Sequence, residues 1–313
     1  MGDFKLGAAV LGRGLGRGFI YFDRLTVGPP DGGVPLPDRG GWGILRARPY
    51  PSSLQHARPM PKVSVIVPAY NEEATVLDVL DRVSEQRIEG VEFEIIVIDD
   101  GSTDCTGTLL EGNPHLYSEL IRLKTNGGKG AAVKAGVERA RGDYVLFQDA
   151  DLEYDPADYA KLMLPVLRFD ADVVIGSRML APTFTRVGYY WHMRGNRFLT
   201  FLFNILYNTT FTDIYSCYVL YRRELIEPAE LRSTGWEQHA EILCRVATRG
   251  VHLFEVPVSY NGRTYGEGKK IRAHHILPVL ATIIRGRFLR SRPVKVLTDG
   301  RAAPQPSYSR RRT

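Results

Sequence analysis

The chain has 313 residues, 44% of them hydrophobic and 24% charged, an ordinary globular composition that allows one large or two small domains without disulfides. Its cysteines, Cys105, Cys217 and Cys244, are an odd number without CxxC spacing. They argue against a zinc site and favour a reducing compartment, so we expect a cytoplasmic protein. The net charge is +6, and residues 290–313 hold seven Arg or Lys against one acid, which equals that surplus.

The two ends of the chain differ in composition from its middle. Residues 1–60 contain 19 Gly or Pro and no periodic apolar pattern, which predicts a disordered extension. The basic residues 291–313 are predicted to be a disordered tail rather than a lipid or RNA contact, and no nucleic-acid partner is expected. We expect neither a signal peptide nor a transmembrane helix, because the most apolar helical stretch, 198–211, is shorter than the ~20 residues that a span needs. The ordered domain is therefore placed at 61–290.

Ordered structure is predicted to begin at Lys62. Apolar, β-branched runs predict buried strands, and apolar residues at helical spacing predict helices. In chain order we expect a strand at 63–67, a helix at 73–86, strands at 93–98 and 119–123, a helix at 128–141, a strand at 144–147, a helix ending near 169 and a strand at 172–175. Because strands and helices alternate, the predicted fold class is α/β, with a mainly parallel central sheet covered by helices on both faces.

The second half of the chain is less regular. We expect helices at 191–207, 237–248 and 271–289 and strands at 218–221 and 251–256. A glycine-rich, basic loop at 260–270 precedes the last helix. Such a loop could close over phosphates and exclude water, and Arg263 and Lys269 are its candidate phosphate ligands. A surface ion pair is the alternative role for each.

Polar residues follow three of the predicted parallel strands, at 68–72, at 99–101 and at 149–151. Ligands of open α/β sheets bind outside the carboxyl ends of the strands, so we expect these segments to share one cleft. Asp149 and Asp151 flank a single small residue and would repel each other without a cation between them. Mg²⁺ and Mn²⁺ favour carboxylate oxygens and leave positions open for substrate phosphates, and Glu153 can add a ligand. A bare acidic turn is the alternative reading.

Other candidates are weaker when taken singly. A carboxylate of Asp99 or Asp100 can accept from a nucleobase or a ribose, although a turn or helix cap also suits them. Asp104 is expected to cap the next helix. Lys129 lies in a glycine-rich helix start, where backbone N–H groups and its own charge favour phosphate. Among Glu237, His239 and Glu241, one could act as a general base toward an acceptor, and a polar helix face is the alternative.

Taken together, these motifs resemble glycosyltransferase family 2 with the GT-A fold. The resemblance rests on VIVPAYNE at 65–72, IDDGSTD at 98–104, NGGKG at 126–130, QDADLE at 148–153 and GSR at 176–178. It covers roughly residues 63–290. Within that family the chain looks most like the dolichyl- or polyprenyl-phosphate sugar synthases, of mannosyl or glucosyl type, and the loop GRTYGEGKK at 262–270 supports that branch.

The resemblance implies an inverting, metal-dependent transfer of a hexose from a UDP- or GDP-sugar to a polyprenyl phosphate, without a covalent enzyme intermediate. It implies that Asp149, Asp151 and Glu153 bind Mg²⁺ or Mn²⁺ and the diphosphate. The nucleotide would be held by Asp99 and by the loop residues Pro68, Tyr70 and Glu72. Arg178 and Arg194 match positions that handle the acceptor phosphate.

The acceptor stays open between a lipid phosphate and a sugar hydroxyl. A phosphate is already anionic and needs no strong base, whereas a hydroxyl acceptor would require one, with Glu241 as the candidate. Two features depart from the family pattern. His239 stands where relatives often carry a carboxylate, and the transmembrane helices of many relatives are not predicted here. A lipid acceptor would then require peripheral membrane docking, for which the helix at 271–289 is a candidate unless it packs on the core.

Overall fold

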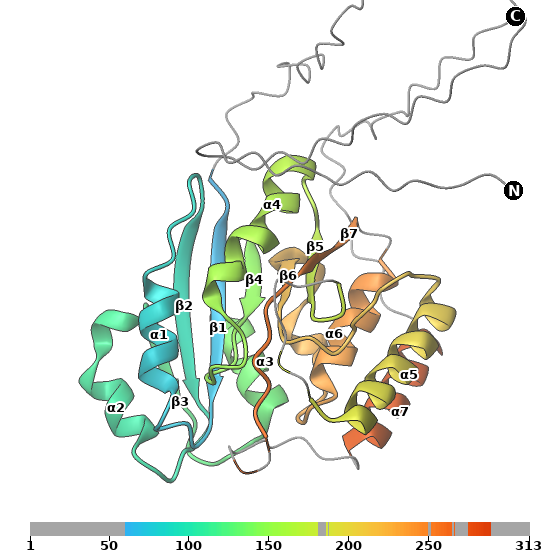
Figure 1. Cartoon of the computed structure of the whole chain (residues 1–313). Coiled ribbons are helices and arrows are strands. Elements are labelled where there is room, and N and C mark those ends of the chain that lie inside the picture. Colours follow the sequence, from blue (N-terminus) through green and yellow to red (C-terminus); the bar gives the residue numbers. More distant parts are fainter. Residues whose placement is uncertain are drawn as a thin grey trace, which may run out of the picture. The chain divides into compact units, whose positions relative to one another are not determined.

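The computed structural model describes residues 60–180, 186, 188–249, 252–264, 266 and 275–288 (Figure 1). These residues contain a seven-stranded sheet with helices on both faces. The strands are β1 (Lys62–Ala69), β2 (Glu92–Asp99), β3 (Glu119–Arg122), β4 (Tyr144–Phe147), β5 (Val173–Ser177), β6 (Val219–Arg222) and β7 (Leu253–Pro257). The predicted α/β fold class is confirmed.

The order of the strands across the sheet is β3-β2-β1-β4-β6-β5-β7. β1 pairs in parallel with β2 and β4, β2 with β3, and β5 with β7. β6 runs antiparallel to β4 and β5, between which it lies. The other strands therefore end at one common edge, called the carboxyl edge here. The segment before β6 reaches the same edge because β6 runs the opposite way.

The helices cover the sheet in two layers and extend beyond one side of it. They are α1 (Val76–Ser84), α2 (Thr106–Gly112), α3 (Lys129–Arg139), α4 (Tyr159–Phe169), α5 (Tyr190–Tyr207), α6 (Gln238–Ala247) and α7 (Ile276–Phe288). Figure 1 shows α1 and α4 in front of the sheet and α3 and α6 behind it. α7 packs on α6 and on α5, so α5 and α7 form a neighbouring pair.

The core follows from the strand sequences. Val65, Ile66 and Val67 of β1 are all fully buried, although successive strand residues point to opposite faces. Helices must therefore cover both faces, as expected of a central parallel strand. α3 approaches β1 closely at Gly136, where a Cβ atom would lie 2.5 Å from Cγ2 of Ile66. A larger residue at Gly136 would push the whole of α3, including its first turn, away from the sheet.

The predicted elements are confirmed, with bounds that differ from the predicted ones by a few residues. The helix predicted at 73–86 spans Val76–Ser84, and the last helix is described from Ile276 to Phe288. The antiparallel direction of β6 was not predicted. Asp104 accepts from the N–H of Thr106 at the start of α2, as expected of a cap. The predicted disordered extension and basic tail lie outside the described residues, apart from Met60.

Candidate active site

Side chains from distant parts of the chain converge at the carboxyl edge. Glu72 follows β1, Asp149 and Asp151 follow β4, and Arg263 follows β7. The convergence expected from parallel strand ends is therefore observed for the segments after β1 and β4. The segment after β7 reaches the same edge. Because β6 lies antiparallel between β4 and β5, the strands β5 and β7 run in the same direction as β4.

Lys129 neutralises one of the predicted metal ligands. Its Nζ lies 2.5 Å from Oδ1 of Asp149 and 5.1 Å from the ring centroid of Trp236. Burial by itself would raise the pKa of Asp149, but the Lys129 ammonium outweighs it and holds that pKa below its ordinary value. Burial would likewise lower the pKa of Lys129, and Asp149 reverses that shift. Both groups therefore stay charged as a mostly buried pair.

Arg263 contacts three further carboxylates at once. Its Nη2 lies 2.5 Å from Oδ2 of Asp151, its Nη1 3.1 Å from Oε2 of Glu72, and its Nε 3.6 Å from Oε1 of Glu153. The backbone N–H of Arg263 also donates to Oε1 of Glu153 at 2.7 Å. The loop after β7 is thus tied to the ends of β1 and β4 through a single guanidinium group.

These contacts define the carboxylate cluster, which consists of Glu72, Asp149, Asp151, Glu153, Lys129 and Arg263. Four carboxylates minus two cations leave a formal charge of −2. The pKa of Asp151 reflects this imbalance. Burial and the charges of Asp149 and Glu153 together raise it to about 7, against the lowering effect of Arg263. The cluster therefore holds more negative charge than its own cations neutralise.

The oxygens of this cluster fit a divalent cation in number and in chemistry, since Mg²⁺ and Mn²⁺ prefer carboxylate ligands. Across the described residues the acids are not arranged as a ready coordination shell. The reason is visible in the contacts, because Arg263 lies among Asp151, Glu153 and Glu72. A metal ion bound here would have to replace the Arg263 guanidinium as the partner of some of these carboxylates.

A second ionic network lies beside the cluster. Arg178, directly after β5, donates to both carboxylate oxygens of Asp213, at 2.7 Å from Nε and 2.9 Å from Nη2. Asp213 is fully buried and also accepts from Nδ2 of Asn196 on α5. The guanidinium of Arg178 lies 4.9 Å from the ring centroid of Tyr260, whose hydroxyl donates to Glu153. Tyr260 therefore joins the two networks.

The candidate nucleotide ligands at the end of β2 already have partners. Asp99 accepts from the N–H of Ser102 at 2.9 Å and from Nε of Arg122 at 3.1 Å. Asp100 accepts from the N–H groups of Gly127 and Gly128, at 2.8 and 3.0 Å. Both carboxylates therefore organise the loops around the β2 end. A direct contact of either with a nucleotide stays a prediction.

The glycine-rich start of α3 is held in a similar way. Gly128 has a φ of 88°, and the N–H of Gly130 donates to the carbonyl oxygen of Thr234 at 2.7 Å. A Cβ atom at Gly130 would lie 2.2 Å from the Ser233 carbonyl oxygen, so the glycine permits this close approach. Several amides expected to bind phosphate are thus occupied within the protein, while the Lys129 charge points to Asp149.

The candidate bases on α6 differ in their surroundings. Glu241 accepts from the N–H groups of Arg232 and Ser233 and from Nη2 of Arg245 at 2.6 Å. Its carboxylate therefore holds the loop before α6. Glu237 accepts from the N–H of Gly235 at 3.2 Å. These hydrogen bonds indicate that both carboxylates stabilise the loop before α6.

His239 is buried, and its Nε2 has no hydrogen-bond partner among the residues that the structure describes. Its ring centroid lies 6.3 Å from that of Phe147 and 6.4 Å from that of Tyr215. Burial, with the nearby Lys129 charge, lowers the pKa of His239 to about 4. The imidazole is therefore neutral near pH 7.

The remaining predicted residues lie around this centre. Tyr70 is partly buried directly after β1, and Pro68 is paired with Ile98 near the strand ends. Arg194 is exposed on α5, and no contact described for it reaches the carboxylate cluster. Lys269 lies outside the described residues. The structure therefore brings Glu72, the acids after β4 and Arg263 together, and leaves Arg194 apart from them.

Two residues of the networks were missed by the sequence analysis. Trp236 packs beside Lys129, and its ring centroid lies 6.1 Å from that of His275, next to α7. Asp213 anchors Arg178 from a segment without a motif. Tyr260 was noted only as the first residue of the basic loop. Only the path of the chain in three dimensions identifies Asp213 as a partner of Arg178.

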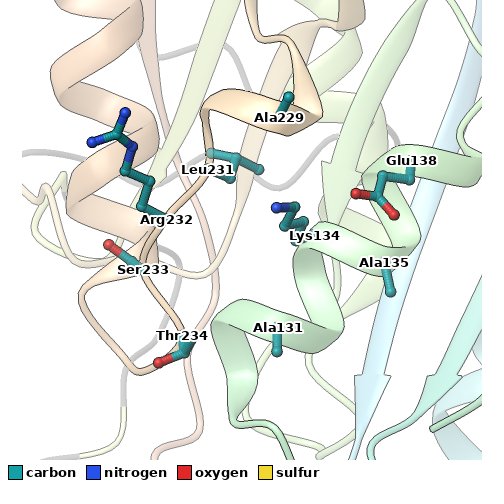
Figure 2. Close-up of a pocket in the computed structure, with 9 residues that line it drawn as sticks. All are labelled: Ala131, Lys134, Ala135, Glu138, Ala229, Leu231, Arg232, Ser233 and Thr234. Atoms are coloured by element: carbon teal, nitrogen blue, oxygen red, sulfur yellow. The ribbon is translucent and has the colours of Figure 1, made fainter.

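Two cavities adjoin these networks. One, of about 370 Å³, is lined by Glu153 and Tyr260 and also by Arg82 and Arg186, so it opens beside the acidic cluster. The other, of about 450 Å³, lies between α3 and the segment before α6 (Figure 2). Its lining residues are Ala131, Lys134, Ala135, Glu138, Ala229, Leu231, Arg232, Ser233 and Thr234. It contains none of the cluster carboxylates and is a separate hollow.

The seven-stranded, mostly parallel sheet with helices on both faces has the GT-A fold. The family model of "Glycosyl transferase family 2" matches residues 64–228, more than half of the chain, and the chain belongs to this family. Glucosyl-3-phosphoglycerate synthase from Mycobacterium tuberculosis, solved with Mn²⁺, UDP-glucose and phosphoglyceric acid, superposes with a TM-score of 0.57 at 22% identity. That match covers 81% of this chain and 87% of the synthase, and it supports the fold.

Two curated relatives are closer in sequence. Glycosyltransferase AglJ of Haloferax volcanii is 34% identical over 208 residues, which are 65% of this chain and 64% of AglJ. Dolichyl-phosphate beta-glucosyltransferase of Dictyostelium discoideum is 38% identical over 144 residues, 41% of this chain and 44% of the relative. The chain thus spans less than two thirds of the length of either relative. Within its described residues, no helix combines the length and apolarity required to cross a bilayer.

Proposed function

We propose that this chain is a metal-dependent, inverting glycosyltransferase that moves a hexose from a UDP- or GDP-sugar to a polyprenyl phosphate at a membrane surface. The observation that carries the proposal is the carboxylate cluster at the carboxyl edge of a family 2 sheet, with its formal charge of −2. A divalent cation brings the missing charge. The name of the Dictyostelium relative supports a lipid-phosphate acceptor.

In this proposal Asp149, Asp151 and Glu153 hold Mg²⁺ or Mn²⁺. The metal, when bound, neutralises the diphosphate that leaves with the nucleotide. Lys129 keeps Asp149 ionised and fixed in position at 2.5 Å. Arg263, which pairs with Asp151, would contribute its guanidinium to binding of the donor phosphates.

The nucleoside is assigned to the end of β1 and β2, where Pro68, Tyr70 and Asp99 surround the edge next to Glu72. Asp99 keeps its bond to Arg122 in the structure, so its remaining acceptor capacity would serve the nucleotide. Tyr260 and Arg263 close the opposite side of the same cluster. A donor bound between them would be shielded from water on both sides.

A phosphate acceptor suits the surroundings of the candidate bases. Such an acceptor is already an anion, so its attack on the sugar does not require a free carboxylate. Glu241 and Glu237 are both engaged by backbone N–H groups of the loop before α6. Arg178 and Arg194 are proposed to stabilise the acceptor phosphate, and Arg178 is preorganised for this by Asp213. The same bonds disfavour Glu241 as the base of a hydroxyl acceptor.

The test is a transfer assay with the purified full chain, UDP-glucose or GDP-mannose, and Mn²⁺ or Mg²⁺, with a polyprenyl phosphate in detergent or with soluble saccharides. We expect transfer that needs both the metal and the lipid phosphate and stops when EDTA is added. Transfer to saccharides alone would refute the lipid acceptor. Donor binding without any metal dependence would refute the role given to the cluster.

A further inference from the structure

α5 carries an apolar stripe that faces solvent. Trp191, Phe198, Phe201 and Ile205 are all exposed, Trp191 by 79%, and Arg194 lies in the same row. The spacings of three and four residues place these side chains on one helical face. The opposite face packs into the core through Leu199, Thr200 and Phe203. α5 is therefore apolar on two sides, of which only one is covered.

α7 repeats this arrangement. Val279 and Ile283 are buried against the rest of the domain, whereas Leu277, Ile284 and Phe288 are exposed, Phe288 by 77%. One face of this helix therefore packs on the core, as one of the two interpretations of its sequence expects, and another face stays exposed. Exposed single hydrophobic residues are common, but a continuous group calls for a partner.

The two helices lie side by side and run in the same direction. Gly195 of α5 is next to Ile276 of α7, and farther along, the hydroxyl of Tyr207 donates to the carbonyl oxygen of Ile283 at 2.8 Å. Figure 1 shows the pair beside α6. Of the thirteen large hydrophobic side chains exposed in the described residues, eight belong to this pair and three to α4. The pair is thus the main exposed apolar region.

The charges of the two helices have a single sign. Arg194 and Arg197 on α5 and Arg285 and Arg287 on α7 are exposed, and neither helix contains an Asp or Glu. No ion pair is recorded for these four arginines within the described part of the chain. A protein partner of mixed charge does not explain this bias. A surface of negative charge over an apolar interior does.

The pair is also connected to the active site at its N-terminal end. Asn196 of α5 donates to Asp213, which holds Arg178. His275, directly before α7, packs against Trp236, which lies beside Lys129. Both helices therefore begin one or two contacts away from the two ionic networks.

We infer that the exposed faces of α5 and α7 form a docking surface for a lipid bilayer with anionic headgroups. Trp191, Phe198, Phe201, Ile205, Leu277 and Phe288 enter the boundary between headgroups and acyl chains, and the four arginines contact lipid phosphates. The inference deepens the proposed function, because a polyprenyl phosphate resides in a bilayer and would meet the site where these helices begin. It rests on the exposed faces and not on the reaction.

The experiment measures binding of the full chain to vesicles without donor or acceptor. Flotation is compared for vesicles of phosphatidylcholine mixed with phosphatidylglycerol and for phosphatidylcholine alone. We expect binding to the anionic vesicles, with quenching of tryptophan fluorescence by brominated acyl chains that is lost in Trp191→Phe. Phe198→Ser combined with Phe201→Ser should weaken partitioning roughly tenfold or more.

A matched control comes from α4, where Leu164 and Leu167 are also exposed. Leu164→Ser combined with Leu167→Ser should leave vesicle binding within about twofold, because α4 lies away from the pair. Arg197→Gln with Arg285→Gln should weaken binding to anionic vesicles roughly tenfold and leave the phosphatidylcholine result unchanged. Equal binding by the wild type and the Phe198/Phe201 variant would overturn the inference.

Light scattering tests the alternative that a second copy of this chain, rather than a bilayer, binds the exposed faces of α5 and α7. A dimer that the Phe198/Phe201 variant dissociates, without vesicle binding by the wild type, would also overturn the inference. The test separates it from the proposed function. Vesicle binding without any sugar transfer refutes the function and keeps the docking surface, whereas transfer to a detergent-solubilised lipid phosphate without vesicle binding does the reverse.

Discussion

The two ionic networks at the carboxyl edge differ in charge balance. In the carboxylate cluster, four acids face two cations, whereas Arg178 and Asp213 form a one-to-one pair whose remaining hydrogen bonds come from Asn196 and from the backbone of Tyr215. The balanced pair is complete in the protein as it stands. The unbalanced cluster lacks positive charge. The difference is that Asp213 holds a single arginine in place, whereas the cluster has an unneutralised charge that a cationic ligand can compensate.

The largest expected effect concerns the unbalanced side. Asp151→Asn should reduce sugar transfer roughly a thousandfold, because it removes a carboxylate proposed to hold the metal and the diphosphate. The free energy of unfolding of the metal-free variant should not fall, since one of several mutually repelling buried carboxylates is gone. Transfer assays and urea unfolding measure the two quantities.

Mn²⁺ provides the internal control for this variant. Added metal should raise the Tm of the wild type, because it binds the folded chain, and should leave the Tm of Asp151→Asn nearly unchanged. Equal stabilisation of both proteins, or transfer that survives the substitution, would show that the cluster does not hold the metal.

The balanced side should respond in the opposite way. Asp213→Ala leaves the Arg178 guanidinium buried without its partner, and breaking such a pair costs about 3–5 kcal/mol of the free energy of unfolding. Glu119→Ala breaks the exposed pair with Arg139 and should cost less than about 1 kcal/mol. Urea unfolding of both variants compares them. Similar losses would mean that the Arg178–Asp213 pair is not the structural anchor its geometry indicates.

His239 lies near charged groups of both networks, and its lowered pKa makes the free energy of unfolding depend on pH. The pKa of His239 in the folded chain is about 4, against an ordinary value of 6.5. Below pH 6.5 the unfolded chain binds a proton that the folded chain does not, so the free energy of unfolding falls as the pH falls. The loss approaches about 3 kcal/mol near pH 4 and is absent well above pH 6.5.

The measurement is urea unfolding at pH 7.5 and at pH 5, where the His239 contribution amounts to roughly 2 kcal/mol. His239→Gln should reduce the difference between the two pH values by about that amount, whatever the variant costs at pH 7.5. His115→Gln, at an exposed position, is the control and should keep the wild-type difference. An unchanged difference in His239→Gln would contradict the buried neutral state.

Much of the unbalanced cluster was predictable from the sequence. Apolar, β-branched strands predicted a parallel sheet, and parallel strands bring the residues after them to one edge. The sequence therefore predicts that Glu72, Asp149 and Asp151 lie close together. Arg263 was expected near phosphates because its loop is glycine-rich and basic. Its contact with three carboxylates follows from the direction of β7, which periodicity does not define.

The balanced pair was not predictable in the same way. Asp213 precedes β6, and in an all-parallel sheet a residue before a strand lies at the amino edge. Because β6 runs antiparallel, Asp213 reaches the carboxyl edge and meets Arg178 after β5. The internal partners of Asp99 and Asp100 were hidden for a related reason. An acid at a strand end looks the same in a sequence whether it binds a nucleotide or a neighbouring loop.

The prediction with the smallest expected effect tests how far Arg263 neutralises the negative charge of the cluster. Its guanidinium contacts Asp151, Glu72 and Glu153, so an incoming cation must compete with it. Arg263→Ala changes the formal charge of the cluster from −2 to −3. Mn²⁺ affinity without donor, measured by titration calorimetry, should then rise roughly five- to tenfold.

Sugar transfer by Arg263→Ala should nevertheless fall, because the variant also loses a group proposed to pair with the donor phosphates. Arg139→Ala on the outer side of α3 is the matched control and should change neither quantity. Tighter metal binding together with slower transfer is the combination that a purely structural arginine would not produce. Weaker metal binding in a folded Arg263→Ala protein would instead mean that Arg263 positions the acids for the metal rather than competing with it.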